Sequence, residues 1–359
     1  MTTSSISSAR TSLGTVTLTI DGVKTRVPEG TTVLEAAGTA GVYVPTLCFD
    51  EDLLPYGGCR LCVVEIDGMR GLPTACTTPV AEGMVVRTET PTVEQSRRIT
   101  MELIMANHHG DCLTCAKNQD CELQRVARYV GMDEAHFERM RKSQELVPLD
   151  ESNPAYIRDM NKCILCARCV RACHEITGID AIDLAFRGDA VTISTFGNRA
   201  ILLSRCETCG ECVSRCPSGA LVYRNCRQAT HEVKTTCPYC AVGCQMYLGI
   251  RGGEIVGVRA DKEGPANEGH LCVKGRFGIA DFVHHQSRLK TPLIKRNGVF
   301  EEATWDEALD LVAGKLETFA PHQVGVVSSA RATNEDNYVM QKFGRVVLRT
   351  NNLDHCARL

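Results

Sequence analysis

This sequence of 359 residues has few aromatic side chains, no long apolar run and no large excess of one charge. Phe, Trp and Tyr make up 5% of it, and Trp305 is its only tryptophan. No apolar run approaches the roughly 20 residues that cross a bilayer, so the sequence predicts no membrane span. The first twelve residues are rich in Ser and Thr and have no apolar core, so we expect no secretory signal.

The two signs of charge are nearly balanced, with 40 Lys and Arg against 43 Asp and Glu and a net charge of −3. They are well mixed along the chain, and this pattern favours no nucleic-acid partner. Hydrophobic residues make up 43% of the sequence, which is enough for buried cores in two or three domains. The composition predicts a cytoplasmic protein.

Cysteine is abundant, with 21 residues. The cysteines recur in C-x-x-C units, a spacing that suits metal ligands better than disulfide loops. A reducing cytosol keeps such thiols available as ligands. All but Cys226 and Cys356 fall, together with one histidine, into five groups of four. The sequence therefore predicts five metal–sulfur sites, and we expect Cys226 to be a buried structural thiol.

The amino-terminal segment predicts a β-hairpin followed by a short helix. Thr15 to Ile20 and Val23 to Val27 alternate like strands around an Asp-Gly turn. Thr32 and Glu35 have the spacing of a capping box in front of apolar residues. A cysteine loop and a strand at Val63 to Ile66 complete the pattern. This order of elements resembles a β-grasp ferredoxin.

The first ligand set is spaced C-x10-C-x2-C-x13-C and consists of Cys48, Cys59, Cys62 and Cys76. Two glycines inside the loop let backbone N–H groups approach cluster sulfides closely. A zinc site also uses four cysteines, but the β-grasp context favours a [2Fe–2S] cluster. The spacing resembles the amino-terminal cluster of the complex I large iron–sulfur subunit and of iron-only hydrogenases.

The second set follows a helical pattern from Val93 to Asn107 and consists of His108, Cys112, Cys115 and Cys121. Taken alone, its H-x3-C-x2-C-x5-C spacing fits a zinc knuckle equally well. Behind the first set, it resembles the His(Cys)3-ligated [4Fe–4S] cluster of the same families. A neutral imidazole in place of a thiolate raises the potential of a cluster. His109 is a rival ligand whose spacing fits less well, so we expect it beside the site or on the surface.

The third and fourth sets form an internal repeat with the spacing C-x2-C-x2-C-x3-C. The first run contains Cys163, Cys166, Cys169 and Cys173, and the second contains Cys206, Cys209, Cys212 and Cys216, followed by Pro217. In the bacterial two-cluster run, the fourth cysteine of each run binds the other cluster. One predicted [4Fe–4S] set is therefore Cys163, Cys166, Cys169 and Cys216, and the other is Cys206, Cys209, Cys212 and Cys173. His174 stands where the pattern usually has proline, which leaves the local turn open.

The fifth set is spaced C-x2-C-x3-C-x27-C and consists of Cys237, Cys240, Cys244 and Cys272. It resembles the amino-terminal [4Fe–4S] domain of molybdenum and tungsten bis-pterin oxidoreductases, and the stretch Leu-Cys-Val-Lys-Gly-Arg around Cys272 strengthens the match. In that family the lysine at the position of Lys274 lies between cluster and pterin. The resemblance therefore implies an electron relay at Lys274, whereas the spacing alone also fits a solvated surface lysine.

Beyond residue 287 the pattern changes to that of an ordinary α/β domain. It predicts a helix from Trp305 to Phe319 with Thr304 as its N-cap, a buried parallel strand from Gln323 to Ser328, and a helix from Asn334 to Leu348. Such a segment is too short to close a parallel sheet with helices on both faces. We therefore expect the start of an incomplete domain.

The predicted fold class is α+β with several domains. The expected order is a disordered tail (1–12), a [2Fe–2S] ferredoxin-type domain (13–92), a His(Cys)3-ligated [4Fe–4S] domain (93–132), a connector (133–155), a two-cluster [4Fe–4S] ferredoxin domain (156–228), a molybdopterin-type [4Fe–4S] domain (230–286) and the start of a molybdopterin oxidoreductase domain (287–359).

Several oxidoreductases share parts of this layout. Iron-only hydrogenases share the first four sets but need further cysteines for their own active-site cluster. The complex I large iron–sulfur subunit shares the first two sets and usually lacks a full two-cluster repeat. It remains the alternative, together with a stand-alone electron-transfer protein, which would have no reason to begin an α/β domain after residue 287.

The whole chain most resembles the catalytic subunit of cytosolic formate dehydrogenases that are linked to NAD(P) or to a hydrogenase. The resemblance implies reversible oxidation of formate to CO2 at a molybdenum or tungsten bis-pterin guanine dinucleotide. It also implies one [2Fe–2S] and four [4Fe–4S] clusters, and a flavin and iron–sulfur subunit or a hydrogenase module as the electron-accepting partner. The stretch from Thr350 to Leu359 resembles the residues that precede the metal-ligating selenocysteine in that family. We therefore expect that ligand at position 360 and no catalytic residue in these 359.

Overall fold

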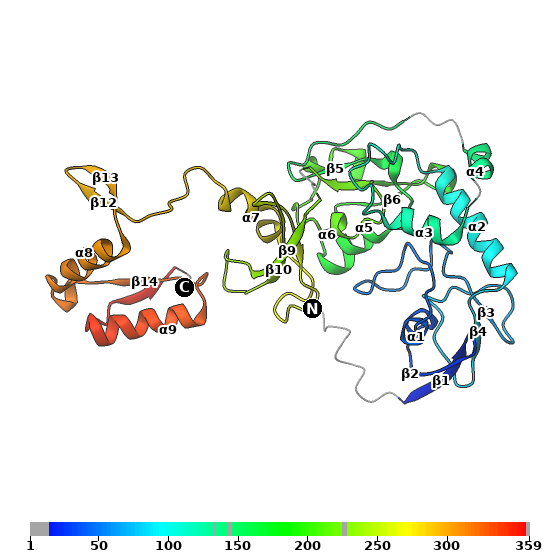
Figure 1. The fold of residues 1–359 in the computed structure, drawn as a ribbon, viewed down its shortest axis with the longest axis horizontal. Coiled ribbons are helices and arrows are strands. Elements are labelled where there is room, and N and C mark those ends of the chain that lie inside the picture. The colour runs from blue at the N-terminus through cyan, green and yellow to red at the C-terminus, as the bar shows by residue number, and fades with distance from the viewer. Residues whose placement is uncertain (1–13, 133, 142–145, 225–227, 357–359) are drawn as a thin grey trace. The chain divides into compact units, whose positions relative to one another are not determined.

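The computed structural model describes residues 14–132, 134–141, 146–224 and 228–356. The chain divides into two compact units, residues 1–224 and 225–359 (Figure 1). The expected tail (1–12), Cys226 and the last three residues of the stretch from Thr350 to Leu359 lie outside the described residues. No helix among the described residues has both the length and the apolarity that a bilayer span needs.

The first unit begins with the predicted β-grasp domain. Its elements are β1 (Thr15–Ile20), β2 (Val23–Pro28), α1 (Val33–Thr39), β3 (Glu65–Ile66) and β4 (Val85–Arg87). The sheet has the order β2-β1-β4-β3, in which β1 pairs with β2 in an antiparallel and with β4 in a parallel arrangement. The amino-terminal hairpin thus pairs with β4, and β3, the first strand after the cysteine loop, lies at an edge of the sheet.

Alternating apolar residues place the core of this domain. Leu18, Ile20 and Val27 are buried under α1, which contributes Val33 and further small apolar residues. The helix begins with the predicted capping box, because the Thr32 hydroxyl accepts from the Glu35 N–H and the Glu35 carboxylate accepts in return. The predicted strand from Val63 to Ile66 is shorter in the structure, since Val63 forms only an isolated bridge to Thr74.

Three helices follow: α2 (Pro91–Ala106), α3 (Glu122–Val130) and α4 (Glu134–Met140). Arg97 of α2 is buried, and its guanidinium donates to the carbonyls of Leu61 and Val63 on either side of a cysteine of the first set. Helix α4 lies in the segment 133–155, which the sequence predicts to be only a connector.

The repeat region is tied together by its two ends. Strand β5 (Tyr156–Arg158) pairs in an antiparallel arrangement with β8 (Leu221–Tyr223). Between them lie α5 (Arg168–Arg171), α6 (Glu211–Ser214) and the hairpin of β6 (Asp183–Ala185) and β7 (Thr192–Ser194). Short 3-10 turns occupy Met160–Lys162, Gly188–Ala190, Phe196–Asn198 and Ile201–Leu203, and a π-helical turn occupies Ala172–Ile176.

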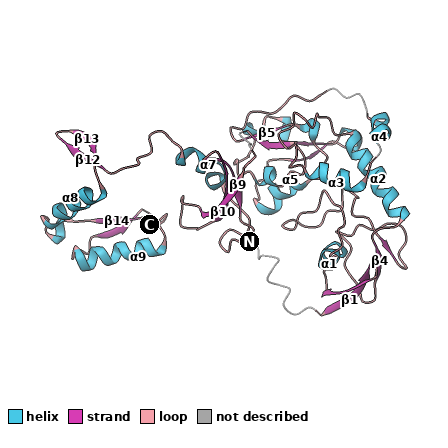
Figure 2. Cartoon of the chain, in the orientation of Figure 1, coloured by secondary structure: helices cyan, strands magenta, loops and turns pink. Residues whose placement is uncertain are grey.

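The second unit begins with a three-stranded antiparallel sheet. Strands β9 (His231–Thr236), β10 (Gln245–Arg251) and β11 (Glu254–Ala260) have the order β11-β10-β9, and α7 (Val273–Val283) packs near them (Figure 2). Buried Met246, Leu271 and Ile279 form its core together with Cys237. The sheet thus carries one cysteine of the fifth set at the end of β9, and α7 begins directly after another.

The last segment has the predicted α/β texture. It contains the hairpin of β12 (Leu293–Arg296) and β13 (Val299–Glu302), then α8 (Trp305–Glu317), β14 (Val326–Ser328), α9 (Asn334–Lys342) and β15 (Leu353–His355), with short helical turns at Pro321–Gln323 and Phe343–Val347. Thr304 caps α8 as predicted, and β14 pairs in parallel with β15.

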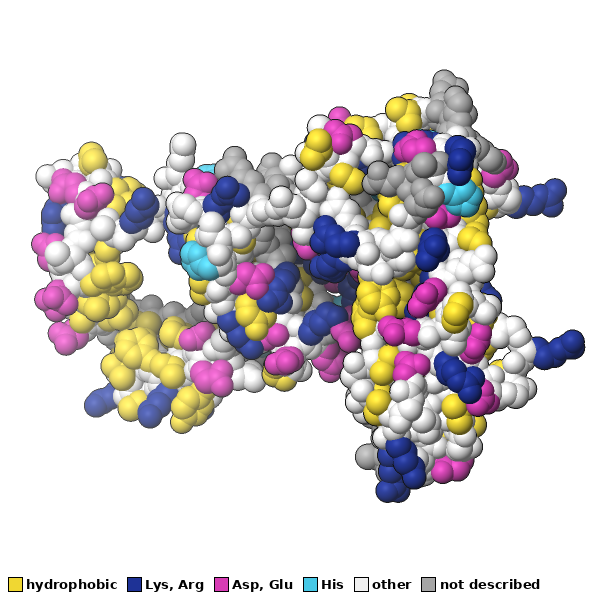
Figure 3. All heavy atoms as spheres, turned by 45° about the vertical axis from the view of Figure 1, so that its right-hand side comes forward, with side chains coloured by type: hydrophobic (Ala, Val, Ile, Leu, Met, Phe, Trp, Pro, Cys, Tyr) yellow, Lys and Arg dark blue, Asp and Glu magenta, His cyan; other side chains and the backbone are white. Residues whose placement is uncertain are grey.

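The burial of this segment differs from the prediction. Val326 is buried, but its neighbour Val327 is 76% exposed, so β14 is buried on one face only. Trp305, Val346 and Val347 are also exposed, and Figure 3 shows hydrophobic side chains gathered on this part of the surface. Parallel strands are usually covered on both faces, whereas β14 is covered on one face in this structure.

Candidate iron–sulfur cluster sites

The first set lies in the loop that leaves the β-grasp sheet. Cys48, Cys62 and Cys76 have 0% exposure, and Cys59 is partly buried. Backbone N–H groups point at the sulfurs, because the Cys59 N–H donates to Cys48 Sγ at 3.5 Å and the Leu47 N–H to Cys59 Sγ at 3.4 Å. Three buried thiols and one partly buried thiol, two of which accept these backbone hydrogen bonds, fit the thiolate ligands of a [2Fe–2S] cluster.

The sulfurs of this set are in mutual hydrogen-bond contact, and their acidities diverge. Hydrogen bonds from the Cys59 and Cys76 thiols lower the pKa of Cys48 to about 2. The same contacts raise the pKa of Cys59 and Cys76, while the Cys76 thiol lowers the pKa of Cys62. Such crowding places negative charge in a buried space, which positively charged iron can compensate.

Two glycines of the loop lie where a side chain would meet an obstacle. A Cβ atom at Gly58 would lie 2.2 Å from the Tyr56 ring, so that ring would have to move. Gly57 before it has φ = +67°, a conformation that glycine adopts without strain. The predicted role of these glycines, close backbone approach to the site, agrees with the N–H contacts to the sulfurs.

The second set surrounds a cavity of about 670 Å³, which is lined by His108, Cys112, Cys115 and Cys121. Across the described residues, no three His, Cys, Asp or Glu side chains form a group that could hold a single metal ion. The four side chains lie around the cavity instead. The backbone of Gly219 approaches one of these ligands closely, since a Cβ atom at this position would lie 2.5 Å from Cys115 Sγ.

The imidazole of His108 has a defined orientation. Its Nδ1 lies 3.0 Å from the carbonyl oxygen of Lys162. A carbonyl only accepts, so Nδ1 carries the proton and Nε2 offers its lone pair, as in many metal-binding histidines. Burial lowers the pKa of His108 and favours this neutral form. The rival His109 does not line the cavity, and its backbone N–H donates to the carbonyl of Asn161.

The third and fourth sets are brought together in the crossed arrangement that the repeat predicts. One cavity is lined by Cys163, Cys166, Cys169 and Cys216. A second cavity is lined by Cys173, Cys206, Cys209 and Cys212. Burial raises the pKa of Cys163 to about 11 and that of Cys166 to about 12, so thiolates at these positions need a compensating positive centre.

The repeat is visible in the backbone as well. Leu165 and Thr208 occupy the same place in the two runs and have φ values of +55° and +58°. Each donates its N–H to the sulfur two residues earlier, Cys163 at 3.4 Å and Cys206 at 3.3 Å. Positive φ is uncommon for such side chains. The two runs therefore adopt the same strained turn, which directs backbone donors at the sulfurs.

The histidine that replaces proline is accommodated by a π-helical turn. His174 lies within the turn Ala172–Ile176, and its Nδ1 lies 2.7 Å from the Asp180 carboxylate. The Ala181 N–H donates to Cys173 Sγ at 3.3 Å, so the sulfur keeps a backbone partner. The turn thus still delivers Cys173 to the cavity lined by the second run.

Tyr156 distinguishes the two otherwise similar cavities, and the sequence motifs alone do not reveal it. Its side chain is 1% exposed, and its hydroxyl lies 3.2 Å from Cys206 Sγ. A metal-bound thiolate has no proton, so the tyrosine would donate. Burial raises the pKa of Tyr156, which keeps the hydroxyl protonated. The position seven residues before the second run is Arg199, so the repeat does not duplicate this donor.

The fifth set lies in the second unit and is the most exposed. Cys237 is buried, Cys244 is partly buried, and Cys240 and Cys272 are exposed. Burial and the neighbouring thiols raise the pKa of Cys237 and Cys244. The N–H of Cys237 donates to the carbonyl of Cys244 at 2.8 Å, which closes the loop between them. Lys274 lies in the first turn of α7 and is exposed.

Comparisons with protein families assign each region of the chain. Residues 14–91 match the 2Fe-2S iron-sulfur cluster binding domain, and residues 97–136 match the NADH-ubiquinone oxidoreductase-G iron-sulfur binding region. Residues 154–222 match the ferredoxin-like domain of NADH-quinone oxidoreductase subunit 3. Residues 230–285 match the molybdopterin oxidoreductase Fe4S4 domain, and residues 288–359 match molybdopterin oxidoreductase. The predicted fold class is thereby confirmed.

Three similar proteins cover nearly the whole chain. The second G-type subunit of the NADH-quinone oxidoreductase of Rhizobium meliloti is 39% identical, and the match covers 96% of this chain and 40% of that protein. NADPH-Fe(3+) oxidoreductase subunit alpha of Geobacter sulfurreducens is 37% identical with the same coverage. A putative formate dehydrogenase of Staphylococcus aureus is 30% identical and covers 95% of this chain and 39% of that protein. The chain thus spans about two fifths of the length of these relatives.

A solved structure shows the same arrangement over part of the chain. A chain of an NAD+-reducing [NiFe]-hydrogenase in the H2-reduced state is 33% identical, with a TM-score of 0.54. The match covers 58% of this chain and 87% of the hydrogenase chain. Chains similar to this one therefore occur in proteins that are named for different reactions.

Replacing Tyr156 by Phe should lower the potential of the cluster held by Cys173, Cys206, Cys209 and Cys212. Loss of a hydrogen bond to a ligand sulfur destabilises the more negative, reduced state. The expected shift is on the order of tens of millivolts, because one charge-assisted hydrogen bond contributes about 1.5–3 kcal/mol at most. A redox titration followed by EPR measures it.

Tyr129→Phe is the control, since the Tyr129 hydroxyl contacts Glu89 and no cysteine. It should leave every potential unchanged. Equal potentials in wild type and Tyr156→Phe would show that the hydroxyl does not donate to a ligand.

Proposed function

We propose that this chain, which carries the amino-terminal iron–sulfur region of a molybdopterin oxidoreductase or of a related NADH-quinone oxidoreductase component, conducts electrons for a formate dehydrogenase. The active site would be a molybdenum or tungsten bis-pterin guanine dinucleotide, and the reaction the reversible oxidation of formate to CO2. The observation that carries the conducting role is geometric: each of three predicted ligand sets lines its own cavity.

The residues of the chain would hold one [2Fe–2S] and four [4Fe–4S] clusters. The [2Fe–2S] ligands are Cys48, Cys59, Cys62 and Cys76. The four-iron sets are His108, Cys112, Cys115 and Cys121; Cys163, Cys166, Cys169 and Cys216; Cys206, Cys209, Cys212 and Cys173; and Cys237, Cys240, Cys244 and Cys272. When bound, the clusters supply one-electron redox chemistry, while the protein sets their spacing and tunes their potentials.

The first unit packs three of these sets around shared residues, which supports a conducting role. Cys59 of the first set and Cys121 of the second belong to one hydrophobic cluster with Ile164, which lies between two cysteines of the repeat. The Lys162 carbonyl that orients His108 belongs to the residue directly before Cys163. Cys121 is buried in this cluster and Cys59 is partly buried, so apolar packing covers one ligand of each of the first two sets.

Formate as the substrate is supported by the molybdopterin oxidoreductase match at residues 288–359 and by the similarity to putative formate dehydrogenases of Staphylococcus aureus. NADH-linked electron transfer in a quinone oxidoreductase is the second candidate, favoured by 39% identity to the Rhizobium meliloti protein. The likeness to an NAD+-reducing hydrogenase supports a flavin and iron–sulfur subunit, or a hydrogenase module, as the partner.

Formate should reduce the clusters of the complete natural protein, isolated without oxygen and without its partner subunits. A viologen dye would serve as the electron acceptor, and absorbance would follow its reduction. NADH should give no reduction in the same preparation, because the flavin subunit is absent. Dye reduction by neither formate nor a panel of other small oxyanions would contradict a catalytic pterin site and favour the second candidate.

Lys274→Ala in the complete enzyme should keep the full iron content and slow electron flow from formate to the dye. The residue is exposed in the first turn of α7, two residues after Cys272, so its replacement should leave the core intact. Lys290→Ala, an exposed lysine in the same unit, is the matched control. Turnover at the wild-type rate in Lys274→Ala would show that this lysine is not part of the electron path.

A further inference from the structure

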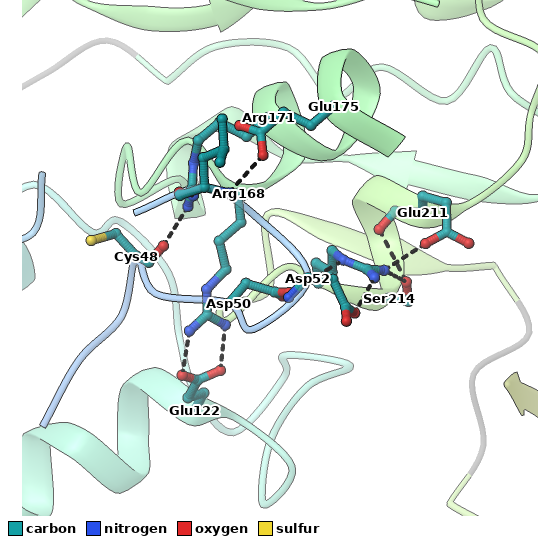
Figure 4. A network of polar contacts seen from close by, with 11 residues as sticks. Cys48, Asp50, Asp52, Glu122, Arg168, Arg171, Glu175, Glu211 and Ser214 are labelled. Atoms are coloured by element: carbon teal, nitrogen blue, oxygen red, sulfur yellow. Dashed lines mark hydrogen bonds and ion pairs between the residues drawn. The ribbon is translucent and has the colours of Figure 1, made fainter. Parts of the chain in front are cut away.

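Charged side chains of the ferredoxin repeat form hydrogen bonds and ion pairs with the loop of the first ligand set. This loop, residues 48–56, leaves the β-grasp domain and reaches α5 and α6 (Figure 4). This group of contacts is made by four side chains, each within two residues of a predicted cysteine ligand: Arg171, Glu175, Glu211 and Arg215. The contact between the two domains is therefore built from residues that the ligand motifs themselves position.

Among these four residues, Arg171 is the one that lies between the two predicted four-iron sites in the sequence. It lies midway between Cys169, which lines one cavity of the repeat, and Cys173, which lines the other. Arg171 is therefore only two residues away, along the chain, from a ligand of each predicted four-iron site. The helix α5 and the following π-helical turn fix its backbone, since Arg171 ends α5.

The guanidinium of Arg171 reaches across to the first-set loop. Its Nη2 donates to the carbonyl oxygen of Cys48, and its Nη1 donates to the carbonyl oxygen of Leu54 at 2.6 Å. The same group lies 5.2 Å from the centre of the Tyr56 ring, a cation–π contact. One side chain thus spans both ends of the loop, and one of its two acceptors is a predicted [2Fe–2S] ligand.

The remaining members hold the loop without touching a ligand of the first set. Glu175 accepts from the Leu54 N–H at 2.7 Å. Arg215 is buried and pairs with Asp52 at 2.6 Å, with Asp50 at 3.6 Å and with Glu211 at 2.5 Å. These contacts involve side-chain carboxylates or the distal end of the loop. Arg171 differs because it donates to the backbone carbonyl of Cys48 itself.

We propose that Arg171 is a positioning residue that holds the backbone of Cys48 against the ferredoxin repeat and so fixes the separation between the [2Fe–2S] site and the four-iron pair. The inference rests on the proposed ligand sets. A donor with two fixed N–H groups suits the task better than lysine, because the planar guanidinium binds two carbonyls in one geometry. Two charge-assisted hydrogen bonds in a partly buried site resist stretching of that gap.

The test measures the magnetic interaction between the sites in the full chain, with dithionite as reductant and no formate. In the wild type, electron-spin relaxation of the [2Fe–2S] signal should quicken once the four-iron pair is also reduced. Arg171→Met removes the donors and keeps the apolar stem. It should retain iron and the [2Fe–2S] signal but lose most of this quickening, a severalfold change in relaxation rate.

Glu175→Ala is the matched control, because it frees the same loop at Leu54 and leaves the Arg171–Cys48 bond in place. It should relax like the wild type. Wild-type relaxation in iron-complete Arg171→Met would overturn the proposal. If Arg171→Met fails to assemble, Arg171→Lys takes its place, because it keeps the charge but lacks the planar group that binds both carbonyls, and wild-type relaxation in that variant also overturns the proposal. Neither result depends on formate, so the two proposals fail separately.

Discussion

Each site has to gather four ligand atoms in a small, partly buried space, and thiolates placed together in such a space repel one another. Burial is the main cause that raises the pKa of Cys163 and Cys166, and the charge of Cys216 adds to it. Two features of the chain oppose this rise. Backbone N–H groups point at the sulfurs, and the surrounding loops adopt left-handed conformations at positions such as Leu165 and Thr208 that make those contacts possible.

The same requirement explains how the domains of the first unit are joined. A cysteine ligand fixes its neighbours in the sequence, so those neighbours are well placed to make contacts of their own. The Lys162 carbonyl orients His108, and the Arg171 side chain reaches the carbonyl of Cys48. A further pair, Arg168 and Glu122, links α5 to α3 at 2.7 Å. Ligand motifs thus form the sites and also connect them.

Local patterns such as ligand spacing, the capping box at Thr32 and the N-cap at Thr304 could be predicted from the sequence, and the cavities group the cysteines of the repeat as expected. Contacts between distant segments could not, because nothing in the spacing indicates that Tyr156 approaches Cys206, 50 residues later. Helix α4 was missed because the charged segment around it gives no clear apolar period. Val327 was predicted to be buried because its run is apolar, but an apolar run does not show which face of a strand is covered, and Val327 is exposed.

The central claim is that five ligand sets hold iron–sulfur clusters and not zinc. Iron, acid-labile sulfide and zinc measured on the anaerobically reconstituted chain test it most directly. One two-iron and four four-iron clusters predict about 18 iron atoms per chain, matched by sulfide, with zinc near zero. An iron content lower by about four, together with one zinc per chain, would contradict the claim at the set that contains His108.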